Sequence, residues 1–318
     1  MNFISAFLKD VLDLINGFVS SYGWSVILFT LLIRLVLMPL DVKSRRSMMR
    51  MNQVQPQMAA LQKKYANDKE KLNQKMNELY KKEGVNPLSG CLPMLIQLPI
   101  LFCMFTAMRV VANEHIVQMI QAMMNGSFAA NSAHYLQPFL WIKSIYQPDS
   151  FMSTVIPAFG DKLQAIQPVA GTILTQDTLN TVRNFLSSDT YKTIAAQFGA
   201  ANTYVLQTKM LFWDFNIPTQ FNGWFVLPLL AGVTQLISSK LLTPTNTATG
   251  TDAQQQTNKM MQWFFPLFSI WICASYTAAF ALYWVFINLF QILQQLFINW
   301  YFDRKKTNPN PEEEVIKP

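Results

Sequence analysis

Apolar residues in this chain are concentrated in four long blocks separated by polar segments. The blocks lie at 23–40, 87–112, 223–242 and 260–302. The first three have about the length of a helix that crosses the roughly 30 Å hydrocarbon core of a bilayer. The fourth contains no charged residue and would form a helix about twice that long. It must therefore reverse direction near Tyr276 to Ala279 and supply two spans, 260–277 and 280–302. The pattern predicts an all-α membrane protein with five transmembrane helices.

Residues 1–22 have the pattern of an amphipathic helix. Apolar side chains recur at spacings of three and four, at Phe3, Phe7, Val11, Leu14 and Phe18. We interpret this segment as a helix lying at the membrane surface. A cleaved signal sequence is the alternative, but Lys9 and Asp10 would interrupt the apolar run that such a signal needs.

Basic residues are concentrated in the segment that follows the first span. Residues 41–84 hold eleven of the 25 Lys and Arg residues against five acids. With five spans, this segment lies on the same side of the membrane as the polar loop 243–259 and the tail 303–318. Short basic loops remain in the cytoplasm, so we expect the C-terminus inside, and the N-terminus and the segment 113–222 outside.

The segment 41–86 is predicted to form a helical hairpin. Narrow apolar stripes mark its two arms, with Val54, Met58, Leu61 and Tyr65 on the first and Leu72, Met76 and Leu79 on the second. Asn67 and Asp68 begin the second arm, and Gly84 and Pro87 end it. The stripes would face each other and leave a basic outer face. That face is either an ordinary solvated surface or a site for anionic headgroups or ribosomal RNA.

The outer segment 113–222 carries few charges and shows no catalytic pattern. Two short helices are predicted in it, at 177–186 and 188–198, because each begins at a residue suited to cap a helix. These capping residues are Asp177 and Ser188.

Composition excludes several classes of protein. The chain is 51% hydrophobic and only 14% charged, whereas soluble domains carry about 25% charged residues. Cys91, Cys103 and Cys273 lie in apolar blocks and fit buried thiols better than disulfides. The two histidines, His115 and His134, are far apart and lack the company of a zinc-binding motif or a hydrolytic triad. We therefore expect a protein that is not an enzyme and holds no cofactor or metal.

Arg34 is the single charged residue of the first span. A central arginine costs at least about 2.5–3.5 kcal/mol on membrane insertion, and the other predicted spans contain no acid that could neutralise it. We expect its guanidinium to face water inside the helix bundle. The alternative is that its side chain extends to the inner interface of the membrane.

Further polar residues in the spans would extend this polar surface. Thr30 lies one turn before Arg34, and Gln97 lies on the second span beside Pro99, which frees backbone carbonyls. The last span carries a polar stripe at helical spacing, formed by Trp284, Asn288, Gln291 and Gln295 with Tyr283 beside it. We expect a water-filled groove with one positive charge. Packing between helices is the alternative role of Gln97.

Several motifs, in this order, resemble the YidC/Oxa-type membrane protein insertases. They are Trp24-Ser25-Val26-Ile27 with Arg34 and Met38-Pro39-Leu40, Gln62-Lys63-Lys64-Tyr65, Gly84 to Pro93 with Leu95 to Pro99, Leu211-Phe212-Trp213 with Leu227-Pro228, and Leu282-Tyr283-Trp284 with Asn288 and Gln294-Gln295. No single motif is decisive, but the ordered set is highly specific.

The resemblance implies five transmembrane helices around a hydrophilic groove that opens to the cytoplasm and to lipid. It also implies a function, which is to insert integral membrane proteins into the bacterial plasma membrane and help them fold, alone or with the Sec translocon. The implied partners are nascent membrane proteins, the Sec translocon and anionic lipids. The ribosome or the signal recognition particle receptor would contact the basic hairpin and tail.

The resemblance also assigns roles to individual residues. By motif position, Arg34 matches the groove arginine of the family and Gln97 matches its polar partner on the second span. The positions that contact a passing substrate are matched by Leu98, Pro99, Tyr283 and Trp284.

Some features depart from the family pattern. Thr277 and Ala279 stand where the family usually has Pro and Gly at an outer turn. The outer segment contains two similar pieces, Phe139-Leu140-Trp141 and Leu211-Phe212-Trp213, which predict an insertion between them. The small N-terminal segment resembles Gram-positive members, yet no cysteine precedes Cys91, so we expect no lipid anchor.

Two rival functions stay open. In the first, the protein is a small-molecule transporter or channel and Arg34 binds an anion, although the five spans show no internal repeat. In the second, the protein is a structural subunit of the Sec complex with no insertion activity of its own.

Overall fold

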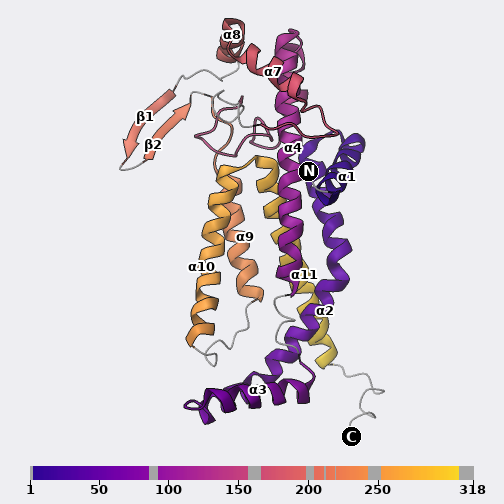
Figure 1. Ribbon diagram of the computed structural model, residues 1–318, viewed down its shortest axis with the longest axis vertical. Coiled ribbons are helices and arrows are strands. Elements are labelled where there is room, and N and C mark those ends of the chain that lie inside the picture. Colours follow the sequence, from indigo (N-terminus) through magenta and orange to yellow (C-terminus); the bar gives the residue numbers. More distant parts are fainter. Residues whose placement is uncertain are drawn as a thin grey trace. The chain divides into compact units, whose positions relative to one another are not determined.

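The computed structural model describes residues 3–85, 92–156, 166–197, 204–210, 213–218, 220–242 and 252–307. The expectation of a predominantly helical membrane protein is confirmed (Figure 1). The long helices are α1 (Phe3–Val19), α2 (Tyr22–Lys64), α3 (Lys69–Glu83), α4 (Leu92–Met124), α9 (Val226–Leu242), α10 (Asp252–Ser275) and α11 (Ala278–Thr307). The predicted loop 243–259 as far as residue 251, the predicted tail from residue 308, and Cys91 lie outside the described residues.

Within the residues that the structure describes, three helical segments are long and apolar enough to cross a membrane. These segments are Tyr22–Met51, Gln97–Met124 and Ala278–Trp300, and two shorter apolar helices cover Val226–Leu241 and Gln262–Ser275. Large apolar side chains project from them, such as Val36 (67% exposed) and Trp271 (62% exposed). Exposed apolar side chains of this size suit contact with lipid rather than with water.

The chain divides into two compact units. Unit 1 comprises Met1–Thr30, Pro99–Val233 and Leu267–Phe286. Unit 2 comprises Leu31–Leu98, Thr234–Pro266 and Ile287–Pro318. Five helices, α2, α4, α9, α10 and α11, contribute to both units, and each unit is described by itself below.

In unit 1, α4 continues past the predicted end of the second span and organises the outer segment. Two short helices, α7 (Gln176–Leu186) and α8 (Asp189–Gln197), pack against it (Figure 1). The buried residues of this packing are Val110, Val117, Ile120, Ile166, Leu174, Leu179 and Val182 in one cluster, and Met119, Ala122, Met123, Phe128, Ile156 and Tyr191 in another.

Both short helices begin close to the predicted positions. The side chain of Thr175, rather than Asp177, caps α7 by accepting a hydrogen bond from the backbone N of Thr178. Ser188 caps α8 in the same way, since its Oγ accepts from the backbone N of Tyr191. The two helices of the outer segment are thus confirmed, with α7 capped by a neighbouring residue.

The outer segment also contains strands that the sequence pattern did not predict. The antiparallel pair β1 (Tyr204–Met210) and β2 (Trp213–Pro218) joins Gln207 to Asn216 in its register. A short apolar run fits a helix or a strand equally well until its partner is known. A small hairpin is therefore an addition to the all-α fold. Two residues of the Leu211-Phe212-Trp213 motif lie outside the described residues, and Trp213 begins β2.

The reversal expected in the fourth apolar block falls at Tyr276 and Thr277, between α10 and α11. Thr277 Oγ1 accepts a hydrogen bond from the backbone N of Phe280, which caps the start of α11. The next residues, Ala278 and Ala279, donate their backbone N–H groups to the outer segment, as described below. These hydrogen bonds therefore stabilise the turn without the Pro and Gly of the family pattern.

In unit 2, α2 passes through Pro39 and Pro56 without ending, so no break separates the first span from the first arm of the predicted hairpin. The second arm is α3, which begins at Asp68, whose side chain accepts from the backbone N of Lys71. It ends at Gly84, whose positive φ of 60° closes the helix.

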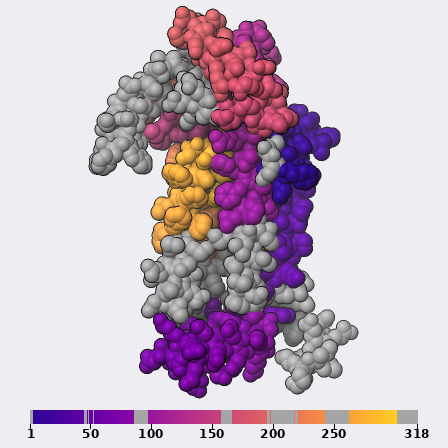
Figure 2. All heavy atoms as spheres, in the orientation of Figure 1, coloured from indigo at the N-terminus to yellow at the C-terminus, as the bar shows by residue number. Residues whose placement is uncertain are grey.

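The end of α2 and the helix α3 share a small apolar cluster. Val54, Leu79 and Val85 are buried in it. Met51, Met58, Leu61 and Tyr80 pack around them. The lysines of α3 lie outside this cluster and are exposed, and Figure 2 shows the helix at the surface of the molecule.

Candidate functional site: a buried polar cluster around Arg34

In unit 2, Arg34 is 7% exposed and binds the last helix. Its Nη2 donates to the backbone O of Ile287 at 3.1 Å and to Gln291 Oε1 at 3.0 Å. Since Ile287 and Gln291 are four residues apart on α11, both acceptors lie on the same face of that helix. The structure therefore places Arg34 and Gln291, two of the predicted site residues, in direct contact.

A carboxylate completes the environment of the arginine. Asp41 Oδ2 lies 3.5 Å from Arg34 Nη1 and accepts a second hydrogen bond, at 3.2 Å, from Gln294 Nε2. The other predicted spans contain no acid, and the acid that faces Arg34 lies instead on the same helix, seven residues further on.

Two further predicted residues extend the polar cluster along α11. Asn288 is buried and its Nδ2 donates to Thr234 Oγ1 on α9, at 3.4 Å. Gln295 is also buried, and its Nε2 donates to Asn299 Oδ1 at 2.9 Å. Buried polar groups persist among apolar helices only where they are hydrogen-bonded. The stripe on the last helix is therefore a set of paired groups in this structure.

The sequence did not predict the roles of four side chains in this cluster, which are Asp41, Thr234, Gln294 and Asn299. Asp41 could have been predicted as a partner of Arg34, because residues seven apart face the same side of an α-helix. Gln294 was noted only as part of a motif, and Thr234 was not singled out. Its pairing with Asn288 joins residues 54 positions apart, which local spacing cannot reveal.

The remaining predicted residues have different surroundings. Gln97 is half-buried and Leu98 is 36% exposed, both on the part of α4 that belongs to unit 2. In unit 1, Pro99 is exposed and Thr30 is buried, with its Oγ1 donating to the backbone O of Val26 at 2.7 Å.

The two aromatic candidates of the last helix also belong to unit 1. Tyr283 is fully buried and Trp284 is 8% exposed. The indole Nε1 of Trp284 donates to Ser269 Oγ at 3.2 Å, which joins α11 to α10. In this conformation both rings serve the packing of unit 1.

A second polar network, in unit 1, joins the outer segment to two helix ends. Asn222 is fully buried, and its Nδ2 lies 2.9 to 3.2 Å from the backbone O atoms of Ser144, Gln147 and Pro148, while its Oδ1 accepts from the backbone N of Ser144. The same segment receives the start of α11. Ala278 donates its backbone N–H to the O of Gln147 at 2.8 Å.

Asp149 anchors the start of α9 in this network. Its Oδ2 accepts from the backbone N of Leu227 at 2.7 Å and from Trp141 Nε1 at 3.1 Å. A carboxylate at a helix N-terminus satisfies an unpaired N–H and favours the helix dipole. Gly223 leaves the space for this carboxylate, since a Cβ there would overlap with Asp149 Oδ1.

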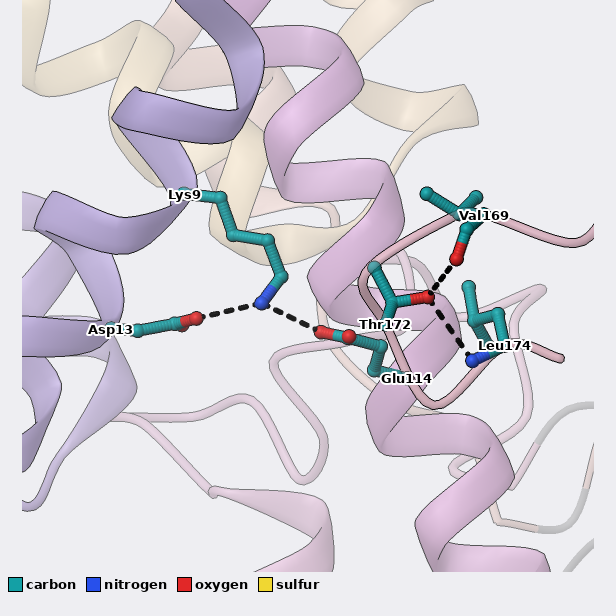
Figure 3. A network of polar contacts seen from close by, with 6 residues as sticks. All are labelled: Lys9, Asp13, Glu114, Val169, Thr172 and Leu174. Carbon is teal, nitrogen blue, oxygen red and sulfur yellow. Dashed lines mark hydrogen bonds and ion pairs between the residues drawn. The ribbon is translucent and has the colours of Figure 1, made fainter. Parts of the chain in front are cut away.

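An ion triplet attaches the N-terminal helix to α4 within unit 1 (Figure 3). Lys9 Nζ lies 2.8 Å from Asp13 Oδ2 and 3.1 Å from Glu114 Oε2. Burial alone would lower the pKa of Lys9, but the hydrogen bonds to Asp13 and Glu114 raise it above its ordinary value. Lys9 therefore remains charged where α1 contacts α4, while Phe3 and Phe18 of α1 are more than 80% exposed.

Metal chemistry has no support in the part of the chain that the structure describes, since no cluster of three or more His, Cys, Asp or Glu side chains occurs there. The fold and the polar cluster define the class of protein as a helical membrane protein with an arginine and its counter-ion among apolar helices. The family follows from comparison with known sequences.

The model of the family described as "60Kd inner membrane protein" matches residues 14–306. The chain belongs to this family, which is the YidC/Oxa-type family that its motifs resemble.

Similar proteins are called "Membrane protein insertase YidC". One from Chlorobium limicola is 30% identical over 292 residues, covering 92% of this chain and 35% of the relative. One from Treponema denticola is 29% identical over 298 residues, covering 92% of this chain and 36% of the relative. The chain therefore spans about a third of the length of these relatives. One from Fusobacterium nucleatum is 37% identical over 166 residues, covering 52% of this chain and 70% of the relative.

Proposed function

We propose that this protein inserts integral membrane proteins into the bacterial plasma membrane and helps them fold. The relatives are called membrane protein insertases, which supports this function. The observation that carries the proposal to particular residues is the contact of Arg34 with α11. It keeps a positive charge among apolar helices, where a charged residue is costly and is retained chiefly for function.

The polar cluster of unit 2 would act as a hydrophilic groove. A substrate whose short polar segment crosses outward would exchange lipid for the hydrogen-bonding side chains of this cluster, and Arg34 would attract acidic residues of that segment. The members of unit 2 that we assign to the groove are Arg34, Asn288, Gln291 and Gln295, with Gln97 and Leu98 as further candidates. For Thr30, Pro99, Tyr283 and Trp284, the substrate role stays a prediction from the family resemblance.

The driving force would be transfer of the adjoining apolar span into lipid. Each Leu, Ile, Phe or Val favours the bilayer centre by about 0.3–0.6 kcal/mol. A span of about 20 such residues therefore outweighs the cost of moving a short polar tail through a hydrated site. The mechanism requires no nucleotide hydrolysis by the protein, and all of its steps are binding steps.

We propose five transmembrane helices, with the basic segment 41–84 in the cytoplasm and the outer segment outside. The three apolar segments of sufficient length and the two shorter apolar helices support this number. On the cytoplasmic side, the exposed lysines of α3 would contact anionic lipids, the ribosome or the signal recognition particle receptor. Cooperation with the Sec translocon would extend the range of substrates.

The test is insertion into liposomes that contain only the purified full chain. The substrate is a small single-span protein with a short acidic tail, and protease protection of that tail reports its translocation. Insertion above the level of empty liposomes establishes an insertase that acts alone. Insertion only after purified Sec translocon is added assigns a Sec-dependent role. Anion transport by the same liposomes without insertion would contradict the proposal and favour a transporter.

A further inference from the structure

The guanidinium of Arg34 contacts both Asp41 and the last helix, and its contact with Asp41 is longer than its contacts with the helix. The Nη2 atom of Arg34 makes the two shorter contacts, 3.1 and 3.0 Å, to neutral acceptors on α11. The Nη1 atom faces the Asp41 carboxylate at 3.5 Å. Close charge-assisted hydrogen bonds between N and O span about 2.7–2.9 Å. The two shorter contacts of the guanidinium are therefore to neutral groups, and its contact with the carboxylate is the longest of the three.

The carboxylate is also the more accessible member of the pair. The Asp41 side chain is 20% exposed and that of Arg34 is 8% exposed. Gln294 Nε2 donates to the same oxygen of Asp41 that faces Arg34, so Gln294 holds the carboxylate in place from α11. Another carboxylate could take the place of Asp41 at Nη1 without disturbing the two bonds that anchor Arg34.

We propose that Asp41 is a built-in counter-ion that competes with acidic residues of the substrate for Arg34. This inference rests on the proposed insertase function and concerns the substrate selectivity of the same site. With Asp41 in place, the pair is close to neutral, so a substrate needs a carboxylate that displaces Asp41. Asp41 thus sets how strongly insertion depends on the charge of the translocated tail.

The proposal predicts a charge-selective effect of Asp41→Asn. An asparagine keeps an acceptor for Gln294 but removes the negative charge that faces Arg34 Nη1. Insertion of a substrate with an acidic tail should rise about twofold to fivefold, the range of a partly solvated ion pair. A neutral tail should show no change, and a basic tail should insert more slowly. The gain should shrink at high salt, because ions screen accessible charges.

The experiment compares three substrates that share one apolar span and differ only in the tail, which is acidic, neutral or basic. Each substrate is inserted into liposomes that contain wild type, Asp41→Asn or Asp41→Glu. The Asp41→Glu variant should behave as wild type because it keeps the negative charge. Glu83→Gln is the matched control, since it removes one exposed negative charge from α3 in the same unit. If Asp41→Asn does not fold, Asp41→Ser, which also keeps an acceptor for Gln294, takes its place.

Each outcome decides the matter. A gain confined to the acidic tail and to the Asp41 variants supports the counter-ion. Equal changes for all three tails, together with a lower unfolding temperature, would show that Asp41 only holds the helices together and would overturn it. An equal gain with Glu83→Gln would assign the effect to net charge. If wild type inserts no substrate, the proposed function itself fails. If wild type inserts but Asp41→Asn changes insertion equally little for all three tails, the insertase function stands and the counter-ion proposal is overturned.

Discussion

Arg34 Nη2 and Gln291 Oε1 lie 3.0 Å apart and join α2 to α11 within unit 2. The amide oxygen of Gln291 is one of the neutral acceptors that keep the guanidinium in place among apolar side chains. Its removal leaves a buried cationic donor with one acceptor fewer, and hydrogen bonds to charged groups contribute about 1.5–3 kcal/mol.

The first prediction is that Gln291→Ala lowers the free energy of unfolding by about 1–3 kcal/mol. It should also slow the insertion of acidic-tailed substrates, because Arg34 is no longer oriented. Unfolding in mixed detergent micelles measures the first effect. Gln57→Ala, at an exposed position of the same helix as Arg34, should leave both quantities unchanged. Equal unfolding free energies for the two variants would contradict the assigned role of Gln291.

The helical character of this protein and its family could be predicted from sequence because both rest on local information. Blocks of about 20 apolar residues require helices in a bilayer, and the family motifs are short and ordered along the chain. Arg34 also stood out locally, as a single charge in an apolar block.

The partners of these residues could not be predicted in the same way. Asp41 was not predicted as the partner of Arg34, because the prediction concerned acids in the other spans and Asp41 lies two turns along the helix of Arg34 itself. The pairing of Asn288 with Thr234 and the contact of Asn222 with Ser144 join residues far apart in sequence. Such contacts depend on how the helices pack, and hydrophobic periodicity gives no information on that.

Asn222 provides the second prediction. Its side chain makes four hydrogen bonds to the backbone of residues 144–148, and truncation would leave the buried N–H and C=O of Ser144 without these partners. Asn222→Ala should reduce the free energy of unfolding of unit 1 by about 2–4 kcal/mol. Asn125→Ala, at an exposed position, is the control. Protease resistance of the outer segment, followed against temperature, reports the difference, and equal resistance in the two variants would refute it.

Two glycines give the third prediction, since the same substitution should have opposite results at each. Gly223→Ala places a methyl group against the Asp149 carboxylate and should detach the cap of α9, at a cost of about 1–3 kcal/mol. Gly17→Ala adds a methyl group in open space on α1 and should stabilise that helix by up to about 1 kcal/mol. Unfolding temperatures compare the two, and a destabilisation of similar size in both would argue against the close contact at Gly223.

The fourth prediction concerns pH and Lys9. Because Asp13 and Glu114 raise the pKa of Lys9 in the folded protein, its stabilising contribution is complete below the ordinary pKa of 10.5. The contribution is lost as the pH rises from there through the raised value, since the unfolded chain releases its proton first. The difference in unfolding temperature between wild type and Lys9→Gln should therefore be largest near neutral pH and should shrink above pH 10.5.

The exposed pair of Lys192 with Asp189 is the comparison for Lys9. Lys192→Gln should change the unfolding temperature little at any pH, because exposed ion pairs contribute little. A difference for Lys9→Gln that stays constant across the alkaline range would show that the lysine acts through packing alone.

In the proposed mechanism, the positive charge of Arg34 draws an acidic tail into the membrane. The measurement is the insertion rate of an acidic-tailed single-span protein into liposomes that contain one of three proteins. These are wild type, the Arg34→Lys variant, and a charge-free double variant that combines Arg34→Ala with Asp41→Asn, so that no unpaired carboxylate remains. We expect the Lys variant to retain most of the rate and the charge-free variant to lose about tenfold or more, with a smaller loss for a neutral tail. Wild-type rates in a folded, charge-free variant would contradict it.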